Sequence, residues 1–288
     1  MIVTNLKVFI HHLTPKFLLT KLAGFFADKN LGFITTSFIK IFVRHYKIDM
    51  SEALREKVDD YKTFNEFFVR ELKDGARPIV EGEDTIASPV DGTMAEFGKI
   101  SYGRLIAAKG QDYSLKELLG DDKDEAQKFI DGTFACIYLA PSNYHRIHMP
   151  ITGKLRKMIF VPGKFYSVNP TYVQKIDNLF TKNERAICFF DTPCGPMAMV
   201  LVGAKIVGSI ITKWAGKVYP SNRKTTTTYN YNGDDQITIN KGEEMGQFCL
   251  GSTVITIFGK DAVTLEESLK TGYTMKLGQK LGLINSSK

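Results

Sequence analysis

The chain has 288 residues, of which 43% are hydrophobic and 24% are charged, and it carries a net charge of +7. This composition excludes a disordered chain, and the length predicts one large domain or one domain with an appendage. The four cysteines form no CxxC pair, which argues against a thiolate zinc site, a thioredoxin-like centre and a secreted disulfide framework. Reduced, buried thiols in a cytosolic protein are expected instead.

The positive charge and many of the aromatic residues gather at the N-terminus. Residues 1–50 contain seven basic and two acidic residues, and they hold seven of the 20 phenylalanines. A basic, Phe-rich end favours a membrane surface over nucleic acid as the partner. No apolar run reaches the roughly 18 residues needed to span a bilayer, and no signal-peptide pattern is evident. We therefore expect a peripheral membrane protein on the cytoplasmic face of the cell membrane.

Two amphipathic helices are predicted in this basic segment. The first begins at Thr14-Pro15, and its apolar stripe comprises Leu18, Leu19, Leu22, Phe25 and Phe26. In the second, the shared apolar face comprises Ile34, Phe38, Ile41 and Phe42, and the opposite face carries Lys40, Arg44 and Lys47. Such helices either pack on their own domain or lie in a membrane interface. The local charge favours the membrane.

The remaining chain is predicted to be mainly strands. Thr63-Phe64-Asn65-Glu66 is a capping box that opens a further helix to about Leu72. From Ser88 onward, short Val-, Ile- and Phe-rich segments predict strands at 133–139, 186–191, 197–202, 205–212, 236–239 and 253–258, with a turn at Asn232-Gly233. The predicted class is α+β: N-terminal amphipathic helices (1–85, a membrane-associating region), then a β-rich body (86–288) of short, mainly antiparallel strands.

Three segments of the body carry residues suited to chemistry. His145 and His148 form a His-x-x-His pair, but no third ligand is obvious nearby, so we predict no metal site. Asp91 lies in Ser88-Pro-Val-Asp-Gly92, which is either an ordinary turn or a rigid turn that orients an imidazole. Ser252 lies in Leu250-Gly-Ser-Thr253, where the preceding glycine lets other groups approach the backbone closely.

The order of the motifs along the chain is more specific than any one of them. They are Phe64-Asn-Glu-Phe-Phe-Val-Arg-Glu-Leu72, Arg77-Pro78, Ser88-Pro-Val-Asp-Gly92, Tyr144-His-Arg-Ile-His-Met-Pro150, Phe165-Tyr-Ser-Val-Asn169, Asn183-Glu-Arg185, Val202-Gly-Ala204, Trp214-Ala-Gly216, Lys241-Gly-Glu-Glu-Met-Gly246 and Leu250-Gly-Ser-Thr253. Together they resemble phosphatidylserine decarboxylase of the bacterial membrane-associated type. The resemblance covers nearly the whole chain from about residue 60.

The resemblance implies a self-processing proenzyme. Ser252 would attack the Gly251 carbonyl, and elimination from the resulting ester would leave dehydroalanine, which hydrolyses to a pyruvoyl group and ammonia. The family relay maps onto Asp91, His148 and Ser252, since a neutral serine needs a base. The products would be a β chain, 1–251, held noncovalently to an α chain, 252–288.

The resemblance also implies the reaction. The pyruvoyl ketone on residue 252 would form a Schiff base with the amine of phosphatidylserine in an anionic membrane, and decarboxylation would give phosphatidylethanolamine. His145 resembles the family histidine linked to decarboxylation, and Ser167 and Asn169 would line the headgroup pocket. Whether the protein forms a homodimer is left open by the sequence.

Three other functions remain alternatives at this point. A Ser-His-Asp hydrolase or acyltransferase would use Ser252 without cleavage of the chain. A β-rich membrane adaptor would have no catalytic activity, and its Lys241–Gly246 segment would be an ordinary hairpin turn. A pyruvoyl decarboxylase for a soluble amino acid would have no need of the amphipathic N-terminus.

Overall fold

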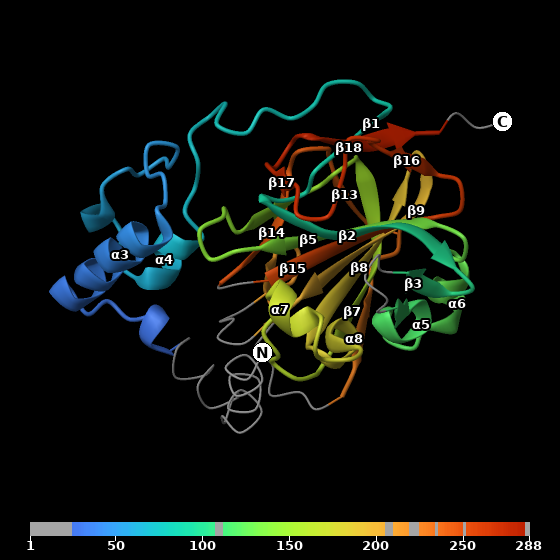
Figure 1. The fold of residues 1–288 in the computed structure, drawn as a ribbon, viewed down its shortest axis with the longest axis horizontal. Coiled ribbons are helices and arrows are strands. Elements are labelled where there is room, and N and C mark those ends of the chain that lie inside the picture. Colours follow the sequence, from blue (N-terminus) through green and yellow to red (C-terminus); the bar gives the residue numbers. More distant parts are fainter. Residues whose placement is uncertain are drawn as a thin grey trace.

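The computed structural model describes residues 25–106, 112–204, 210–218, 225–233, 236–249 and 252–285. It confirms the α+β class, because N-terminal helices are followed by a body of antiparallel strands (Figure 1). The helical unit lies beside the β-rich body, and an extended segment after α4 leads from one to the other (Figure 1).

The helical unit contains α3 (Phe33–Tyr46), the 3₁₀ helix η1 (Val58–Asp60) and α4 (Phe64–Phe68). Its small core is aromatic, and Ile39 of α3 packs there against Tyr61, Phe64, Phe67 and Phe68. The predicted second amphipathic helix is confirmed as α3. The predicted first helix lies almost entirely outside the described residues, which begin at its last two stripe residues, Phe25 and Phe26.

Thr63 caps the helix as predicted, although the Glu66 side chain accepts from the Lys62 backbone N–H rather than from that of Thr63, and the helix is shorter than predicted. The Thr63 hydroxyl accepts a hydrogen bond from the Glu66 backbone N–H at 3.1 Å. The helix ends at Phe68 rather than near Leu72. The reason is tertiary pairing, because Leu72 forms an antiparallel bridge with Ala53 and those residues must be extended.

An 11-stranded antiparallel sheet forms the centre of the body. Its strand order is β12 (Thr227–Asn230), β7 (Gly153–Val161), β8 (Arg185–Thr192), β9 (Gly195–Val202), β15 (Ser252–Phe258), β5 (Thr133–Leu139), β2 (Gly92–Ser101), β3 (Arg104–Ile106) and β4 (Asp112–Ser114). In addition, β13 (Ile237–Ile239) pairs with β7 and β17 (Thr274–Met275) pairs with β2.

Two smaller sheets and four short helices cover this sheet. The four-stranded sheet has the order β11 (Gly216–Lys217), β10 (Ile210–Thr212), β14 (Glu244–Phe248) and β6 (Arg146–His148). The three-stranded sheet has the order β1 (Thr85–Ala87), β18 (Lys280–Ile284) and β16 (Val263–Leu265). The helices are α5 (Leu115–Leu118), α6 (Lys123–Gln127), α7 (Pro170–Val173) and α8 (Leu179–Lys182).

The predicted strands are mostly confirmed. The segment 133–139 is β5 itself, and 186–191, 197–202 and 253–258 lie within β8, β9 and β15. The segment 236–239 gives β13, and only 210–212 of the segment 205–212 is a described strand, because 205–209 lie outside the described residues. Gly233 of the predicted turn has a φ of +61°, and its carbonyl accepts from the Gln236 backbone N–H at 3.1 Å, but residues 234 and 235 lie outside the described residues.

The central sheet is buried on both faces. One face shares a core with the two smaller sheets, and Val254 and Phe258 of β15 point into it. The other face shares a second core with residues of α5, α6 and α8, and Ile255 and Ile257 point there. This alternation follows from the two-residue period of a strand. It decides which face each functional side chain of β15 can reach.

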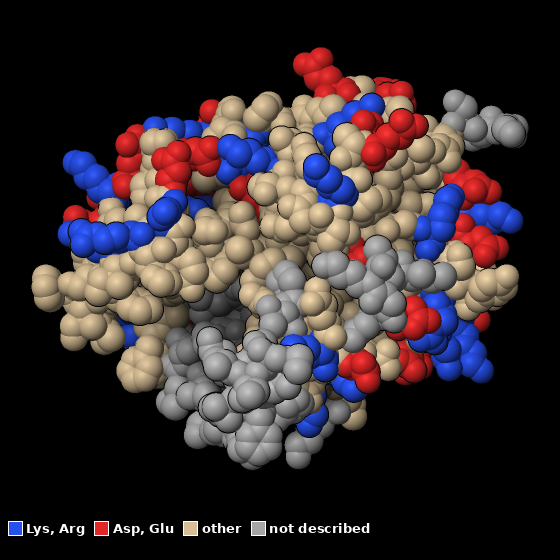
Figure 2. All heavy atoms as spheres, in the orientation of Figure 1, with Lys and Arg blue, Asp and Glu red and all other residues tan. Residues whose placement is uncertain are grey.

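The surface of the helical unit is unusually apolar. Most of the exposed large hydrophobic side chains in the described part of the chain belong to residues 25–54, including Phe33 (84% exposed), Ile34 (65%) and Ile41 (66%). In Figure 2 the lower side of this unit is nearly free of charged groups, which gather along its upper side. The helices found among the described residues are too short or too polar to cross a bilayer.

Candidate active site

Ser252 is the first residue of β15 and is completely buried. It pairs with Leu139 of β5, and Leu139 belongs to the core shared with the smaller sheets. Because directly paired residues point to the same face, Ser252 faces the core shared with the two smaller sheets, one of which carries His148. Its Oγ finds no hydrogen-bond partner within the described residues. Gly251, the other half of the predicted cleavage site, lies outside them.

His148 ends β6 and is held as a neutral base. Its Nδ1–H donates to the Gly242 carbonyl at 2.8 Å, so Nε2 carries no proton and accepts from the Tyr144 hydroxyl at 3.2 Å. Burial lowers the pKa of His148 below its ordinary value, although the hydrogen bond to Gly242 opposes that shift. The atom that a serine proton would have to reach is therefore unprotonated.

The Lys241–Gly246 segment positions this histidine. Gly242 has a φ of +81°, and a Cβ added there would lie 2.8 Å from Cγ1 of Ile79. Only glycine fits this backbone conformation and this space. The Lys241-Gly242 pair can be recognised in the sequence as part of a motif. The role of the Gly242 carbonyl as the acceptor for His148 cannot, because the two residues are 94 positions apart in the chain.

Asp91 is buried and makes its hydrogen bonds with groups other than His148. Arg77 donates to both carboxylate oxygens, from Nε at 2.9 Å and from Nη2 at 2.7 Å, and the Leu277 backbone N–H donates at 2.8 Å. Burial alone would lower the pKa of Arg77, but the hydrogen bonds to Asp91 and Glu52 raise it above its ordinary value. Neither Arg77 nor Glu52 was predicted from the sequence to take part in the site.

The predicted relay is thus brought together only in part. The His148 backbone N–H donates to the Pro89 carbonyl at 2.9 Å, which holds β6 against the segment that carries Asp91. Ser252 faces the same core layer. Among the described residues, however, no side-chain hydrogen bond joins Asp91, His148 and Ser252.

We predict that Arg77→Met destabilises the fold by about 3–5 kcal/mol, because it leaves the Asp91 carboxylate buried without its cation. Arg104→Met is the matched control, since Arg104 and Asp112 form an ion pair that is about half exposed. That change should cost at most about 1 kcal/mol. Urea unfolding of both variants in a Ser252→Ala background measures the difference. Equal losses for the two variants would contradict the prediction.

His145 is fully buried beside the helical unit. Its ring centroid lies 4.1 Å from that of Phe68, and its Nδ1–H donates to the Asn143 carbonyl at 2.8 Å. Burial lowers the pKa of His145 to about 3. The ring is therefore neutral, and its Nε2 is a buried acceptor with no hydrogen-bond partner in the described part of the chain.

Arg70 lies close to His145 and was not predicted from the sequence. It is 4% exposed, and its Nε and Nη1 have no hydrogen-bond partner among the described residues. Its Nη2 lies 3.4 Å from the Ser142 carbonyl. Burial lowers the pKa of Arg70, and its charge in turn helps to lower that of His145. A buried guanidinium with unused donors can hold an anionic group of a substrate.

Ser167 and Asn169 lie in the segment between β7 and α7. The Asn169 backbone N–H donates to Ser167 Oγ at 3.4 Å. Val168, between them, lines a cavity of about 200 Å³ together with Thr253 and Tyr138. Thr253 points to the opposite face of β15 from Ser252, so this segment reaches the neighbour of the predicted nucleophile rather than its hydroxyl.

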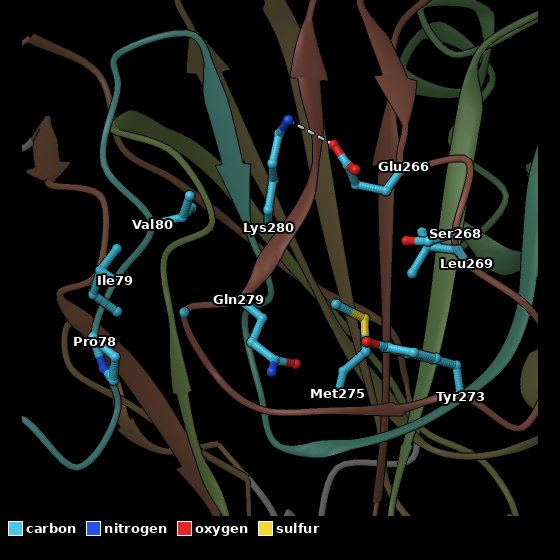
Figure 3. Close-up of a pocket in the computed structure, with 11 residues that line it drawn as sticks. Pro78, Ile79, Val80, Glu266, Ser268, Leu269, Tyr273, Met275, Gln279 and Lys280 are labelled. Atoms are coloured by element: carbon cyan, nitrogen blue, oxygen red, sulfur yellow. Dashed lines mark ion pairs between the residues drawn. The ribbon is translucent and has the colours of Figure 1, made fainter.

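A second cavity, of about 470 Å³, lies beside the three-stranded sheet (Figure 3). Residues 78–80 and residues between 266 and 280 line it, and Lys280 pairs with Glu266 at 2.7 Å. None of the predicted site residues lines this cavity. Among the described residues, no cluster of three His, Cys, Asp or Glu side chains could hold a metal ion.

Fold and site together define a β-rich protein with a buried serine at the start of a central strand and two neutral histidines in the segment 145–148. Residues 64–283 match the family model described as phosphatidylserine decarboxylase, and residues 6–47 match a second model described as PSD. The chain belongs to the phosphatidylserine decarboxylase family.

Curated relatives agree with this assignment. The chain is 51% identical to the phosphatidylserine decarboxylase proenzyme of Aliivibrio salmonicida (strain LFI1238), over 95% of this chain and 96% of the relative. It is 51% identical to the protein of the same name from Hahella chejuensis (strain KCTC 2396), over 97% and 94%. With that from Idiomarina loihiensis (strain ATCC BAA-735 / DSM 15497 / L2-TR), the identity is 49% over 98% of each chain.

Proposed function

We propose that this protein decarboxylates phosphatidylserine to phosphatidylethanolamine at a membrane surface, after cutting itself at Ser252. The single observation that carries the proposal is the buried Ser252 Oγ without a hydrogen-bond partner in the described part of the chain, at the first residue of β15. An unpaired hydroxyl is available for chemistry, and that of Ser252 faces the core shared with the smaller sheets, one of which carries His148, whereas the equally unpaired Thr253 faces the opposite side of β15. Residues 86–288 would form the catalytic domain, and residues 1–85 the membrane-associating region.

The self-cleavage uses the groups described above. Ser252 Oγ attacks the Gly251 carbonyl, and the proton of the hydroxyl passes to the unprotonated Nε2 of His148, which must release Tyr144 to receive it. Asp91 acts from beside His148, with Arg77 fixing its carboxylate. The hydrolase alternative lacks support, because the relatives are named as proenzymes.

The residues present fit a pyruvoyl group at position 252. Ser252 is buried with its Oγ unpaired among the described residues, and His145 is a second buried residue whose neutral Nε2 has no partner there. When formed, that group supplies a ketone that binds the substrate amine and withdraws electrons as carbon dioxide leaves. Arg70 would hold an anionic part of the headgroup, and Ser167 and Asn169 would line the pocket for it.

Intact mass spectrometry of the purified protein tests this proposal. Two chains should appear, 1–251 and 252–288, and hydroxylamine should add to the smaller one, which carries the ketone. Its N-terminus should be blocked to Edman sequencing. An active protein of 32.4 kDa that remains a single chain and does not react with hydroxylamine would contradict the proposal.

The helical unit would bring the active site to its lipid substrate. Its exposed apolar side chains offer insertion area, and basic residues near the surface contribute about 1 kcal/mol each to binding of anionic lipid. Ile39 packs into the core of the unit, whereas Ile34 and Ile41 of the same helix point outward. One side of α3 therefore packs on its own unit, and the other side is exposed and suited to a membrane interface. We propose peripheral binding to the cytoplasmic face.

We predict that the double change Ile34→Glu and Ile41→Glu weakens binding to anionic vesicles by about 100-fold. Each isoleucine side chain that inserts into the membrane contributes about 1.5 kcal/mol or more to binding. Self-cleavage should be unchanged. Tyr102→Glu is the matched control, because Tyr102 is 98% exposed on the β-rich body. Vesicle co-sedimentation measures binding. If the double variant sediments like the control, the apolar side of α3 is not the membrane-binding surface.

A further inference from the structure

The segment Asn183-Glu-Arg185 enters β8 with three buried polar side chains. The Asn183 amide group bonds to the backbone of Tyr166 and of Gly203. The Arg185 guanidinium donates to four backbone carbonyls, those of Glu117, Leu118, Thr181 and Asn183. Glu184 differs from both neighbours, because its Oε1 is buried and has no hydrogen-bond partner among the described residues.

The fold alone does not explain this glutamate. It is 5% exposed, and burial raises its pKa to about 9. At neutral pH the carboxyl therefore keeps its proton. A buried polar group without a partner destabilises the fold, and an apolar residue would occupy the position at lower cost.

The strand register brings Glu184 and Ser252 to one face of the central sheet. Val202 of β9 pairs with Arg185 on one side and with Thr253 on the other. The next row across the sheet is therefore Glu184, Gly203 and Ser252, and the Gly203 backbone N–H donates to the Glu184 carbonyl at 2.9 Å. Residues in one such row point to the same face.

Gly203 leaves a gap between these two side chains. Strands lie about 4.8 Å apart, so the Cα atoms of Glu184 and Ser252 are separated by roughly 10 Å. A Cβ added at Gly203 would meet only the Glu184 carbonyl oxygen within 4 Å, at 3.3 Å. A substrate group attached at residue 252 could extend over Gly203 toward the Glu184 carboxyl.

His145 cannot supply a proton to such a substrate in the state that the structure describes. Its single ring proton is on Nδ1, where it is donated to the Asn143 carbonyl. Its Nε2 is an acceptor. The proton that replaces the lost carboxylate must come from another group.

We propose that Glu184 is the proton donor of the decarboxylation, an inference that rests on the proposed function. When the bond to the carboxylate breaks, carbon dioxide leaves and its electron pair remains on the substrate α-carbon. The proton on the Glu184 carboxyl passes to that carbon and forms the new C–H bond. Glu184 is left as a carboxylate and regains a proton from water before the next turnover.

Glu184→Gln, assayed in D₂O, tests this assignment by the stereochemistry of the product. The wild type should place deuterium on one face of the ethanolamine α-carbon. The variant should still cut itself and react with hydroxylamine, but it should release product about 10²–10⁴-fold more slowly and deuterate both faces. Infrared spectra at neutral pH should also lose one protonated-carboxyl band in the variant, a readout independent of activity.

Two further variants complete the experiment. Glu125→Gln changes a buried glutamate that is paired with Arg156 and Lys157, and it should keep stereospecific deuteration. Gly203→Ala puts a methyl group into the gap and should slow decarboxylation without removing the carboxyl band. If Glu184→Gln does not fold, the rate and stereospecificity of Gly203→Ala test the assignment of Glu184 instead.

A Glu184→Gln enzyme that deuterates one face at the wild-type rate would overturn the assignment. So would an uncut variant, or an unchanged carboxyl band. If Glu184→Gln does not fold, wild-type rate and stereospecificity in Gly203→Ala would also overturn it. A wild type that forms no ketone or releases no carbon dioxide from phosphatidylserine would instead contradict the proposed function itself.

Discussion

Ser252→Ala is expected to leave one uncut chain of 32.4 kDa with no decarboxylase activity. Alanine offers no oxygen to attack the Gly251 carbonyl, and without the cut no ketone can form at position 252. Denaturing gels, intact mass and release of carbon dioxide from phosphatidylserine measure the three consequences. The loss of activity should be complete rather than graded.

Thr253→Ala provides a control on the same strand. Thr253 is also completely buried, and its Oγ1 also lacks a partner among the described residues, but it points to the opposite face of β15. This variant should cut normally. A Ser252→Ala protein that is still cut would overturn the assignment of the nucleophile.

His148→Ala and His145→Ala are expected to fail at different stages. His148→Ala should accumulate as the uncut chain, as should Asp91→Ala, because the serine then lacks its base. His145→Ala should still cut, wholly or in part, but should decarboxylate at least about tenfold more slowly, because the buried Nε2 acceptor, rather than a proton donor, is lost. Fragment analysis and carbon dioxide release on the same preparations separate the two roles. If both histidine variants stay uncut, or both keep full activity, the division is wrong.

The rate of self-cleavage should be nearly independent of pH above about 6.5, the ordinary pKa of histidine. Burial lowers the pKa of His148, so the neutral base is fully present above that value and is lost only as the pH falls through the lowered pKa. A time course of fragment formation between about pH 5 and pH 8.5 measures this. A rate that rises steadily from pH 7 to pH 8.5 would contradict it.

Much of the fold follows from local patterns in the sequence. β5, β8, β9 and β15 are predicted because runs of β-branched and aromatic residues suit a strand that is buried on both faces. The length of α4 could not be predicted, since its end depends on the bridge between Ala53 and Leu72. Local propensity does not contain that contact.

The site is predictable to a smaller degree. Asp91, His145, His148 and Ser252 follow from motifs and from resemblance, but their hydrogen-bond partners come from distant segments. Leu277 bonds to Asp91 across 186 residues. Glu184 was recognised in the sequence only as part of the Asn183-Glu-Arg185 motif. Its position on the same face as Ser252 depends on the register of β8, β9 and β15, which the sequence does not show.

The position of β15 in the sheet has a consequence for the order in which folding and cleavage take place. The 37 residues from Ser252 onward supply this strand, which pairs on both sides with β5 and β9, and they also supply β16, β17 and β18. A chain cut before folding would need to recruit its own central strand from solution, against the entropy of association. Under the proposed cleavage, the peptide bond before Ser252 would hold β15 to the rest of the chain during folding and would no longer be needed once the sheet is complete. Halves expressed separately should assemble poorly, whereas the native nick should hold the two pieces together until the whole sheet unfolds.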